Sequence, residues 1–394
     1  MQRWIAILIA LLMIPGLTRA QFTGYISSGI GAHSNPLYNY EMVPDAVAEE
    51  YLELKYTDES DVRVWTFGYI GGAMFFRQLS PRNYYEHRGK LDFQAEKLRL
   101  AGSIAGRHDK SEFKEFDNFG AELSGSYAWE DGSPGFTLSD VAGLRNYPYV
   151  QELSNIYNTV QAAFSSGSKK SLAAQYTISF GIKHFTTTSI DTGSFAVVHS
   201  SGKGNNGKGK SMGPGLGSQS SSGKKQYLLS SSGSVNSVQI AAGVSLGKEW
   251  KGGGMDAGLT YRLNPGSDAR LLSNVANNSV IGGDLYNDNF NYGGPELLLS
   301  GHQELILGLH FSATGEVQLR RYLAPAFDLN GVQTDPERVD MRGSVQVSLA
   351  RSLPLGENVS LDLTITVTLQ RNSSNDAYND FSASAAGLSI GVGF

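Results

Sequence analysis

The sequence predicts an all-β fold, a closed antiparallel transmembrane β-barrel of about 16 strands. Apolar and polar residues alternate with a period of two through most of the chain, which is typical of strands with one apolar face. No stretch after Gln21 approaches the roughly 18 consecutive apolar residues of a membrane-spanning helix. Because hydrocarbon cannot satisfy backbone amides, a sheet that closes on itself is the only non-helical structure able to span a membrane.

The first residues predict a signal peptide over 1–20. Arg3 gives a positive start, an apolar run extends over 5–14, and Pro15 and Gly16 interrupt it. The run is too short to cross about 30 Å of hydrocarbon as a retained anchor. Small residues at the usual cleavage spacing end at Ala20, so we expect the mature chain to begin at Gln21 and the barrel to occupy 21–394.

Alternation and turn residues together place the strands. One row of apolar residues is Leu361, Leu363, Ile365, Val367 and Leu369, and another is Leu305, Leu307, Leu309, Phe311 and Ala313. Each row has the length, about 9–11 residues, of a tilted spanning strand. The expected strands are 22–33, 47–57, 62–77, 84–94, 98–107, 117–130, 135–146, 153–165, 171–186, 234–248, 254–263, 294–302, 305–323, 337–351, 358–371 and 380–394.

The C-terminal segment adds a more specific observation. Counting back from Phe394, the apolar residues Val392, Ile390 and Leu388 alternate with small ones, and the chain ends on an aromatic residue. This segment resembles the closing strand of Gram-negative outer-membrane β-barrel proteins, and the chain as a whole looks porin-like. The resemblance implies a place in the cell outer membrane, contact with lipid and lipopolysaccharide, and recognition of the last strand by the barrel-assembly machinery through Phe394.

The lengths of the connections indicate which end of the barrel faces outward. Short, turn-like connections at 57–61, 132–135, 167–170, 248–253 and 353–357 are expected on the periplasmic side. Longer ones at 34–46, 78–83, 187–233, 264–293, 324–336 and 372–379 are expected outside. Aromatic residues near the strand ends, among them Tyr84, Tyr147 and Phe381, suggest interfacial girdles.

Composition excludes several classes of function. The formal charge of −5 argues against nucleic acid as a partner, because nucleic-acid binding favours a basic surface. The chain has no Cys, which excludes disulfides and covalently attached haem. We find no P-loop, GxSxG or HExxH motif, and so predict no enzyme activity, cofactor or metal. A soluble propeller or solenoid is the alternative fold, but no fixed repeat is present.

Polar residues that alternate with the apolar rows are the candidates for the barrel interior. If the apolar rows face lipid, three consecutive strands contribute one polar wall, made of His310, Gln318, Arg320, Arg342, Gln346, Asp362, Thr364 and Thr366. Charges across a water-filled pore select among small hydrophilic solutes. The same charges are equally suited to pair with one another and stiffen the interior.

The segment 187–233 is rich in Gly and Ser and is expected to be a mobile extracellular loop. It carries Lys203, Lys208, Lys210, Lys224 and Lys225, which suit either a lipopolysaccharide phosphate or simple solvation. A second polar segment, 371–380, is rich in Asn and Asp and is expected to form local turns rather than a Ca²⁺ site.

These patterns favour a passive or weakly selective channel for small polar solutes, since a barrel of about 16 strands is wide enough for water. The alternative is a non-transporting surface barrel whose extracellular loops bind a partner protein or a polyanion. Uptake of a hydrophobic ligand is less favoured, because the expected inner rows are polar.

Overall fold

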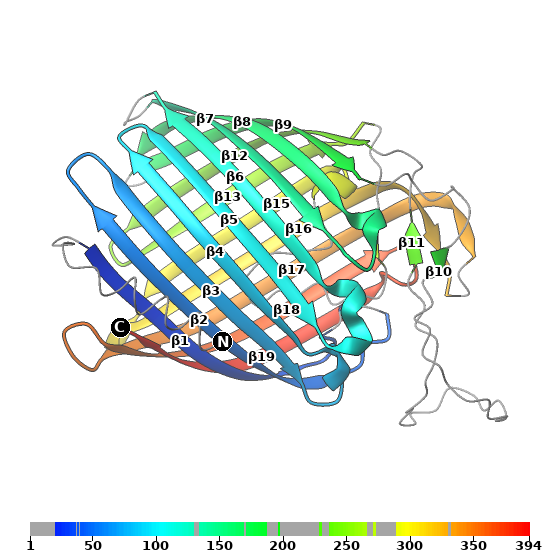
Figure 1. Ribbon diagram of the computed structural model, residues 1–394, viewed down its shortest axis with the longest axis horizontal. Helices are drawn as coiled ribbons and strands as arrows, with labels where there is room; N and C mark the ends of the chain where they lie inside the picture. The colour runs from blue at the N-terminus through cyan, green and yellow to red at the C-terminus, as the bar shows by residue number, and fades with distance from the viewer. Residues whose placement is uncertain are drawn as a thin grey trace.

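The computed structural model is a closed barrel of sixteen antiparallel strands (Figure 1). It describes residues 20–36, 38, 40–129, 134–168, 171–186, 196–197, 228–230, 236–265, 271–272, 289–329 and 332–394. The barrel strands are β1 (Ala20–His33), β2 (Asp45–Glu59), β3 (Val64–Phe76), β4 (Tyr84–Ala95), β5 (Leu98–Asp109), β6 (Asn118–Ala128), β7 (Gly135–Asn146), β8 (Asn155–Ser168), β9 (Leu172–Phe185), β12 (Asn236–Trp250), β13 (Gly253–Leu263), β15 (Gly294–Glu304), β16 (Leu309–Phe327), β17 (Gln333–Pro354), β18 (Ser360–Ser374) and β19 (Phe381–Gly393). The predicted fold class is confirmed.

The sheet closes where β1 pairs with β19. The paired residues run from Tyr25 opposite Gly393 to His33 opposite Ala385. Beyond the strand, the Phe394 amide donates to the Gly24 carbonyl at 2.9 Å, and the Gly24 amide donates to the Phe394 carbonyl at 2.7 Å. A Cβ atom on Gly24 would overlap the Phe394 ring, so the close approach requires glycine here. The last residue of the chain therefore completes the barrel wall.

One predicted strand is wrong at its start. Residues 305–308 were expected to begin a strand, but β15 ends at Glu304 and a one-turn helix, η5 (Ile306–Gly308), reverses the chain into β16. The Leu305 amide donates to the Leu309 carbonyl at 2.7 Å, and Leu307 has a φ of 64°. An apolar turn has the same composition as a strand end, so alternation alone did not separate the two.

The direction of the barrel follows the predicted topology. The start of β1 and the C-terminus lie at one end, together with short turns such as 60–63, 96–97 and 355–359. The longer connections lie at the other end, which is therefore the extracellular one. Two of these connections pair in a small separate sheet of β10 (Ala196–Val197), β11 (Leu228–Ser230) and β14 (Leu271–Leu272), at the outer end of the barrel (Figure 1). Residues 1–19 of the predicted signal peptide and the lysines of 187–233 lie outside the described residues, while Ala20, the last residue of that peptide, is the first residue of β1.

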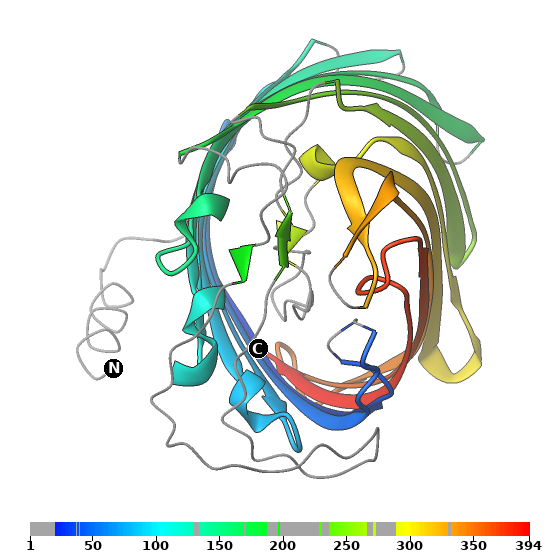
Figure 2. The same ribbon diagram turned by 90° about the vertical axis from the view of Figure 1, so that its right-hand side faces the viewer.

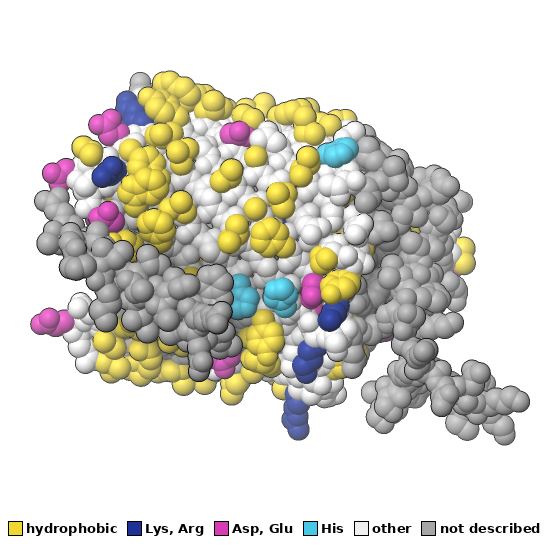
Figure 3. Space-filling view, viewed as in Figure 1, with side chains coloured by type: hydrophobic (Ala, Val, Ile, Leu, Met, Phe, Trp, Pro, Cys, Tyr) yellow, Lys and Arg dark blue, Asp and Glu magenta, His cyan; other side chains and the backbone are white. Residues whose placement is uncertain are grey.

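The barrel wall has an apolar outer face. Residues such as Ile30, Leu123 and Met341 point outward and are 59–70% exposed, and Figure 3 shows hydrophobic side chains spread over this surface. The buried apolar residues gather instead near the outer rim, where Met74, Phe76 and Tyr84 pack together. Tyr84, Tyr147 and Phe381 are buried, so their assignment to interfacial girdles was wrong.

Within the described residues, no helix is long and apolar enough to cross a membrane.

Several outer connections turn toward the barrel axis (Figure 2). The end of the β13–β15 connection, which holds η4 (Asn289–Asn291), lies against the inner wall. The Phe290 ring contacts the position where Gly181 of β9 lacks a side chain, and the Asn264 amide donates to the Phe290 carbonyl at 2.9 Å. This part of the connection narrows the outer half of the lumen.

Candidate functional site

The eight predicted lumen residues lie on three adjacent strands, β16, β17 and β18. In each strand they alternate with outward residues, of which Val317, Met341 and Ile365 are 45%, 59% and 53% exposed. They therefore share the face opposite the apolar belt. The register between the strands sets their neighbours: Gln318 is opposite Arg342, Arg320 opposite Asp340, Gln346 opposite Thr314 and Thr368, Thr364 opposite Ala350, Thr366 opposite Ser348, and Asp362 opposite Ser352.

Two of these residues, Gln318 and Arg320, belong to a chain of polar contacts along the wall. Glu296 of β15 is at its centre. It accepts from the Arg262 guanidinium of β13 at 2.6 Å and from the Gln318 amide of β16 at 2.9 Å. Gln318 also contacts Glu316, and the Gln318 amide oxygen accepts from Arg320. These groups satisfy one another across three strands, so this part of the wall is internally paired.

Arg342 extends this wall toward β18. With the Gln370 amide turned so that its oxygen faces the guanidinium, that oxygen accepts from Nε at 2.8 Å and from Nη2 at 3.0 Å. His310 lies nearer the periplasmic end, opposite Ala350. The predicted residues therefore form one continuous surface, and its side-chain contacts concentrate in the outer half.

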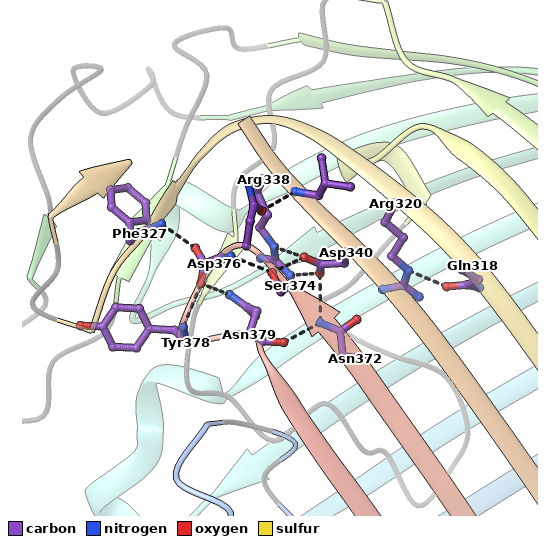
Figure 4. A network of polar contacts seen from close by, with 12 residues as sticks. Gln318, Arg320, Phe327, Arg338, Asp340, Asn372, Ser374, Asp376, Tyr378 and Asn379 are labelled. Atoms are coloured by element: carbon purple, nitrogen blue, oxygen red, sulfur yellow. Dashed lines mark hydrogen bonds and ion pairs between the residues drawn. The ribbon is translucent and has the colours of Figure 1, made fainter. Parts of the chain in front are cut away.

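A second polar network closes the outer rim beside β17 and β18 (Figure 4). Arg338 donates from Nε to Asp340 at 2.9 Å, and Ser374 donates to the same carboxylate at 2.6 Å. Asp376 accepts from the backbone amides of Phe327 and Tyr378, at 3.2 Å and 3.1 Å, and from the Asn379 amide at 2.8 Å. The expectation that Asn and Asp of 371–380 form local turns is confirmed.

The same segment joins two outer connections. The Tyr378 ring packs edge-on against Tyr40, with centroids 5.2 Å apart. Burial, followed by the nearby Glu41 carboxylate, raises the pKa of Tyr40 to about 12. Burial also raises the pKa of Asp376, against the opposing effect of the Arg338 guanidinium. Tyr40 therefore remains an uncharged packing group at neutral pH.

A polar hollow on the opposite side of the lumen was missed at the sequence level. Its volume is about 410 Å³, and it lies over β4, β5, β6 and β7. It is lined by basic residues Arg88, Lys90 and Arg99 together with acidic Asp92 and Glu122. Arg99 and Asp92 form an ion pair at 2.8 Å. The signal was available in the sequence. Arg88, Lys90, Asp92 and Arg99 alternate with outward apolar residues in the strands expected at 84–94 and 98–107, and Glu122 does so in the strand expected at 117–130.

A second hollow, of about 390 Å³, lies between β7 and β13. Arg145, Gln161, Gln239 and Arg262 line it, and Phe290 contributes from the β13–β15 connection. The hollow thus presents amide and guanidinium groups to a solute, together with the aromatic rings of Tyr157 and Phe290. In the part of the chain that the structure describes, no group of three or more His, Cys, Asp or Glu residues is arranged to hold a metal ion.

No family model matches the chain, and no curated protein matches it in sequence. Solved structures match its fold. OccK8 (OprE) of Pseudomonas aeruginosa aligns at 10% identity with a TM-score of 0.51, over 95% of this chain and 98% of its own. OccAB3 of Acinetobacter baumannii aligns at 11% identity with a TM-score of 0.50, over 95% and 99%. OccAB2 of the same species aligns at 9% identity with a TM-score of 0.50, over 96% and 98%.

These likenesses show the fold alone. The chain has the fold of Gram-negative outer-membrane β-barrels, as the C-terminal strand indicated. With its apolar outer belt, the barrel is placed in the cell outer membrane, in contact with its lipid.

Proposed function

We propose that the barrel is a passive, weakly selective channel for small polar solutes. The observation that carries the proposal is the distribution of polar groups: the inward positions of strands around the barrel are rich in charged and amide side chains, while the outward positions are mainly apolar. A closed barrel of this strand number encloses enough space for water. The resemblance in fold to the Occ structures fits this role.

The predicted lumen residues have a defined part in this proposal. Gln346, Asp362, Thr364 and Thr366 line the periplasmic half, where polar but largely uncharged groups favour hydrated solutes over apolar ones. Gln318, Arg320 and Arg342 lie nearer the outside, and the basic side chains of β4 and β5 lie on the opposite wall of the barrel. Charges on both sides of a narrow aqueous path set its preference for anions or cations.

The first test is reconstitution in planar lipid bilayers, where the purified barrel is expected to produce discrete conductance steps. The charge-reversing variant Lys90→Glu alters the lined hollow without touching the apolar belt. It is expected to shift the reversal potential in a salt gradient toward cation preference. Lys248→Glu, at the periplasmic end of β12 and on the outer parity, is the matched control and should leave the reversal potential unchanged.

Silent bilayers containing correctly folded wild-type barrel would refute the channel. Equal shifts from Lys90→Glu and Lys248→Glu would refute the assignment of Lys90 to the conducting path while leaving the channel itself intact.

A further inference from the structure

A serine and a glutamate lie on the outer face of the barrel, inside the apolar belt. On β1, Ser28 stands between Ile26 and Ile30, which point outward and are 50% and 66% exposed. Glu50 of β2 is directly opposite Ser28, and the Ser28 hydroxyl donates to its carboxylate at 3.0 Å. The Glu50 side chain therefore projects outward between apolar neighbours rather than into the lumen.

Two further polar side chains share this face on the next strands. Tyr69 of β3 is two residues from Phe67, which is 50% exposed, and His87 of β4 lies two residues from the outward Tyr85. The Tyr69 hydroxyl and the His87 Nδ1 atom are 2.6 Å apart, and the two rings stack with centroids 6.1 Å apart. Figure 3 shows imidazole groups exposed near the middle of this face. Ser28, Glu50, Tyr69 and His87 are called the outer polar patch below.

Glu50 and His87 lie at about the same depth. Because the strands are tilted, residues that pair directly across the sheet lie farther outward on each successive strand from β1 to β13. The row of paired residues that begins at Ala20, at the periplasmic end of β1, ends at Leu263, at the outer end of β13. The residue aligned with Glu50 on β4 is Tyr85, and His87 is two residues nearer the periplasm. The outward shift of paired residues from β2 to β4 compensates for these two residues, so Glu50 and His87 lie at a similar depth.

The strand between the two ionisable groups, β3, has small outward residues there and so a low profile on the barrel surface. On β3, Ala73 is opposite Glu50 and Gly71 is opposite His87. A Cβ atom on Gly71 would lie 3.1 Å from the Tyr69 hydroxyl, so the Tyr69 ring lies over Gly71 and its hydroxyl contacts His87. One ring and one methyl group are therefore all that β3 places between Glu50 and His87, and a neighbouring molecule can approach both groups.

The rest of the belt sets a contrast. On β16 to β19 the outward rows through the middle of the wall are apolar or small, as in Val317, Val345, Ile365 and Leu388. The outward ionisable residues, such as Arg321, Arg351 and Arg371, lie in the outer part of β16 or close to the strand ends. An ionisable group on the lipid face becomes more unfavourable with its depth in the bilayer. The patch on β1 to β4 is therefore poorly suited to lipid.

We propose that the outer polar patch is an interface with a second copy of this chain. One patch carries both an acid and a base at equal depth, so it is complementary to itself. A twofold axis along the membrane normal, passing between the two groups, brings Glu50 of each copy to His87 of the other. Each carboxylate then meets an imidazole instead of hydrocarbon, and the low profile of β3 lets the two walls approach closely.

The experiment uses full-length chains carrying two different affinity tags, produced together and purified in detergent from outer membranes. Wild-type copies are expected to co-purify and to show an assembly mass above that of one chain. Glu50→Lys alone sets an ammonium group against each imidazole, and His87→Glu alone sets two carboxylates against each other. Each change replaces an attractive contact by one between two groups that repel each other when both are charged. The amount of the second copy that co-purifies should therefore fall about tenfold or more in each single variant.

The two single variants complement each other when they are produced together. A Glu50→Lys chain meeting a His87→Glu chain brings an ammonium group to a carboxylate at one contact and keeps the wild-type pair of carboxylate and imidazole at the other. This mixed pair is therefore expected to co-purify more than either single variant with itself. The paired substitutions Glu50→Leu and His87→Leu in one chain remove the ionisable groups without introducing new charge. They should give folded single chains, with folding checked by the mobility of unheated samples in SDS gels.

Asp140→Leu is the control. Asp140 is also outward, on β7, but it is already paired with Asn158 at 2.7 Å and has no base beside it at that contact. It should not change co-purification. A wild-type mass of one chain, single variants that still associate, a mixed pair no better than the single variants, or an equal loss with Asp140→Leu would each overturn the proposal.

Discussion

At the scale of single residues, the inner wall is held by charged groups that have several partners. The Glu296 carboxylate receives Arg262 from one neighbouring strand and Gln318 from the other, and its side chain is only 19% exposed. Hydrogen bonds to charged groups contribute more than neutral ones, and a group left without its partner costs the most. Glu296 therefore fixes the positions of two side chains that face the lumen.

We expect Glu296→Ala to destabilise the barrel by about 1–3 kcal/mol, because the guanidinium of Arg262 and the amide of Gln318 lose their shared acceptor in a half-buried site. The measurement is the temperature at which the folded form disappears in SDS gels. Glu296→Gln keeps one acceptor oxygen and should lose less than the alanine variant. Identical melting of the alanine variant and wild type would contradict this account.

At the scale of elements, the β15–β16 turn carries a backbone cost. Leu307 has a left-handed φ of 64°, a conformation that glycine and asparagine adopt more readily than leucine. Ile306 and Leu307 are also 82% and 73% exposed. The turn thus combines backbone strain with an apolar tip at the periplasmic surface.

Leu307→Asn is expected to raise the unfolding midpoint by the equivalent of up to about 1 kcal/mol, because asparagine tolerates the left-handed region. Leu307→Val should lower it, since a β-branched residue fits that region poorly. Both are measured by urea unfolding in the same detergent. A loss of stability in the asparagine variant as large as in the valine variant would mean that the leucine side chain contributes more than the backbone strain costs.

The elements also show what the sequence could and could not predict. Strand positions were predicted well because lipid on one side and water on the other impose a period of two along the whole chain. The turn at 305–308 was missed because its residues are as apolar as the strands beside it. The inner position of Gln318 and Arg320 follows from alternation. Their partner Glu296 lies on β15, and a local pattern of alternation does not predict which residues of neighbouring strands lie opposite each other.

The lumen hollow on β4 to β7 illustrates the same limit. Arg88, Lys90 and Arg99 have the inner parity that the pattern predicts, yet their concentration on one side of the lumen depends on which strands become neighbours. The outward Glu50 and His87 are the reverse case. Each interrupts an otherwise apolar row, and alternation predicted their strands without marking their significance.

At the scale of the whole molecule, closure depends on the two ends of the chain. The aromatic ring of Phe394 covers Gly24, and the two backbones exchange hydrogen bonds there. Phe22 lies beside the same ring, with centroids 6.5 Å apart. The terminal aromatic residue therefore has a packing role in the finished barrel, besides any recognition during assembly.

Gly24→Ala is expected to weaken closure by about 1–3 kcal/mol, because the added methyl group would overlap the Phe394 ring and force it to move. The double variant Gly24→Ala with Phe394→Leu replaces the ring by a more adaptable side chain and should recover part of that loss. Unfolding midpoints of the single and double variants measure the coupling. Additive losses would show that the two residues do not interact through the ring.

The closure of the barrel between β1 and β19, at Gly24, has a consequence for biogenesis. Because β1 pairs with β19 and Phe394 supplies the last hydrogen bonds of the wall, a chain that lacks β19 has two open sheet edges, and such edges invite aggregation. We therefore expect the unclosed chain to need shielding until β1 and β19 have paired.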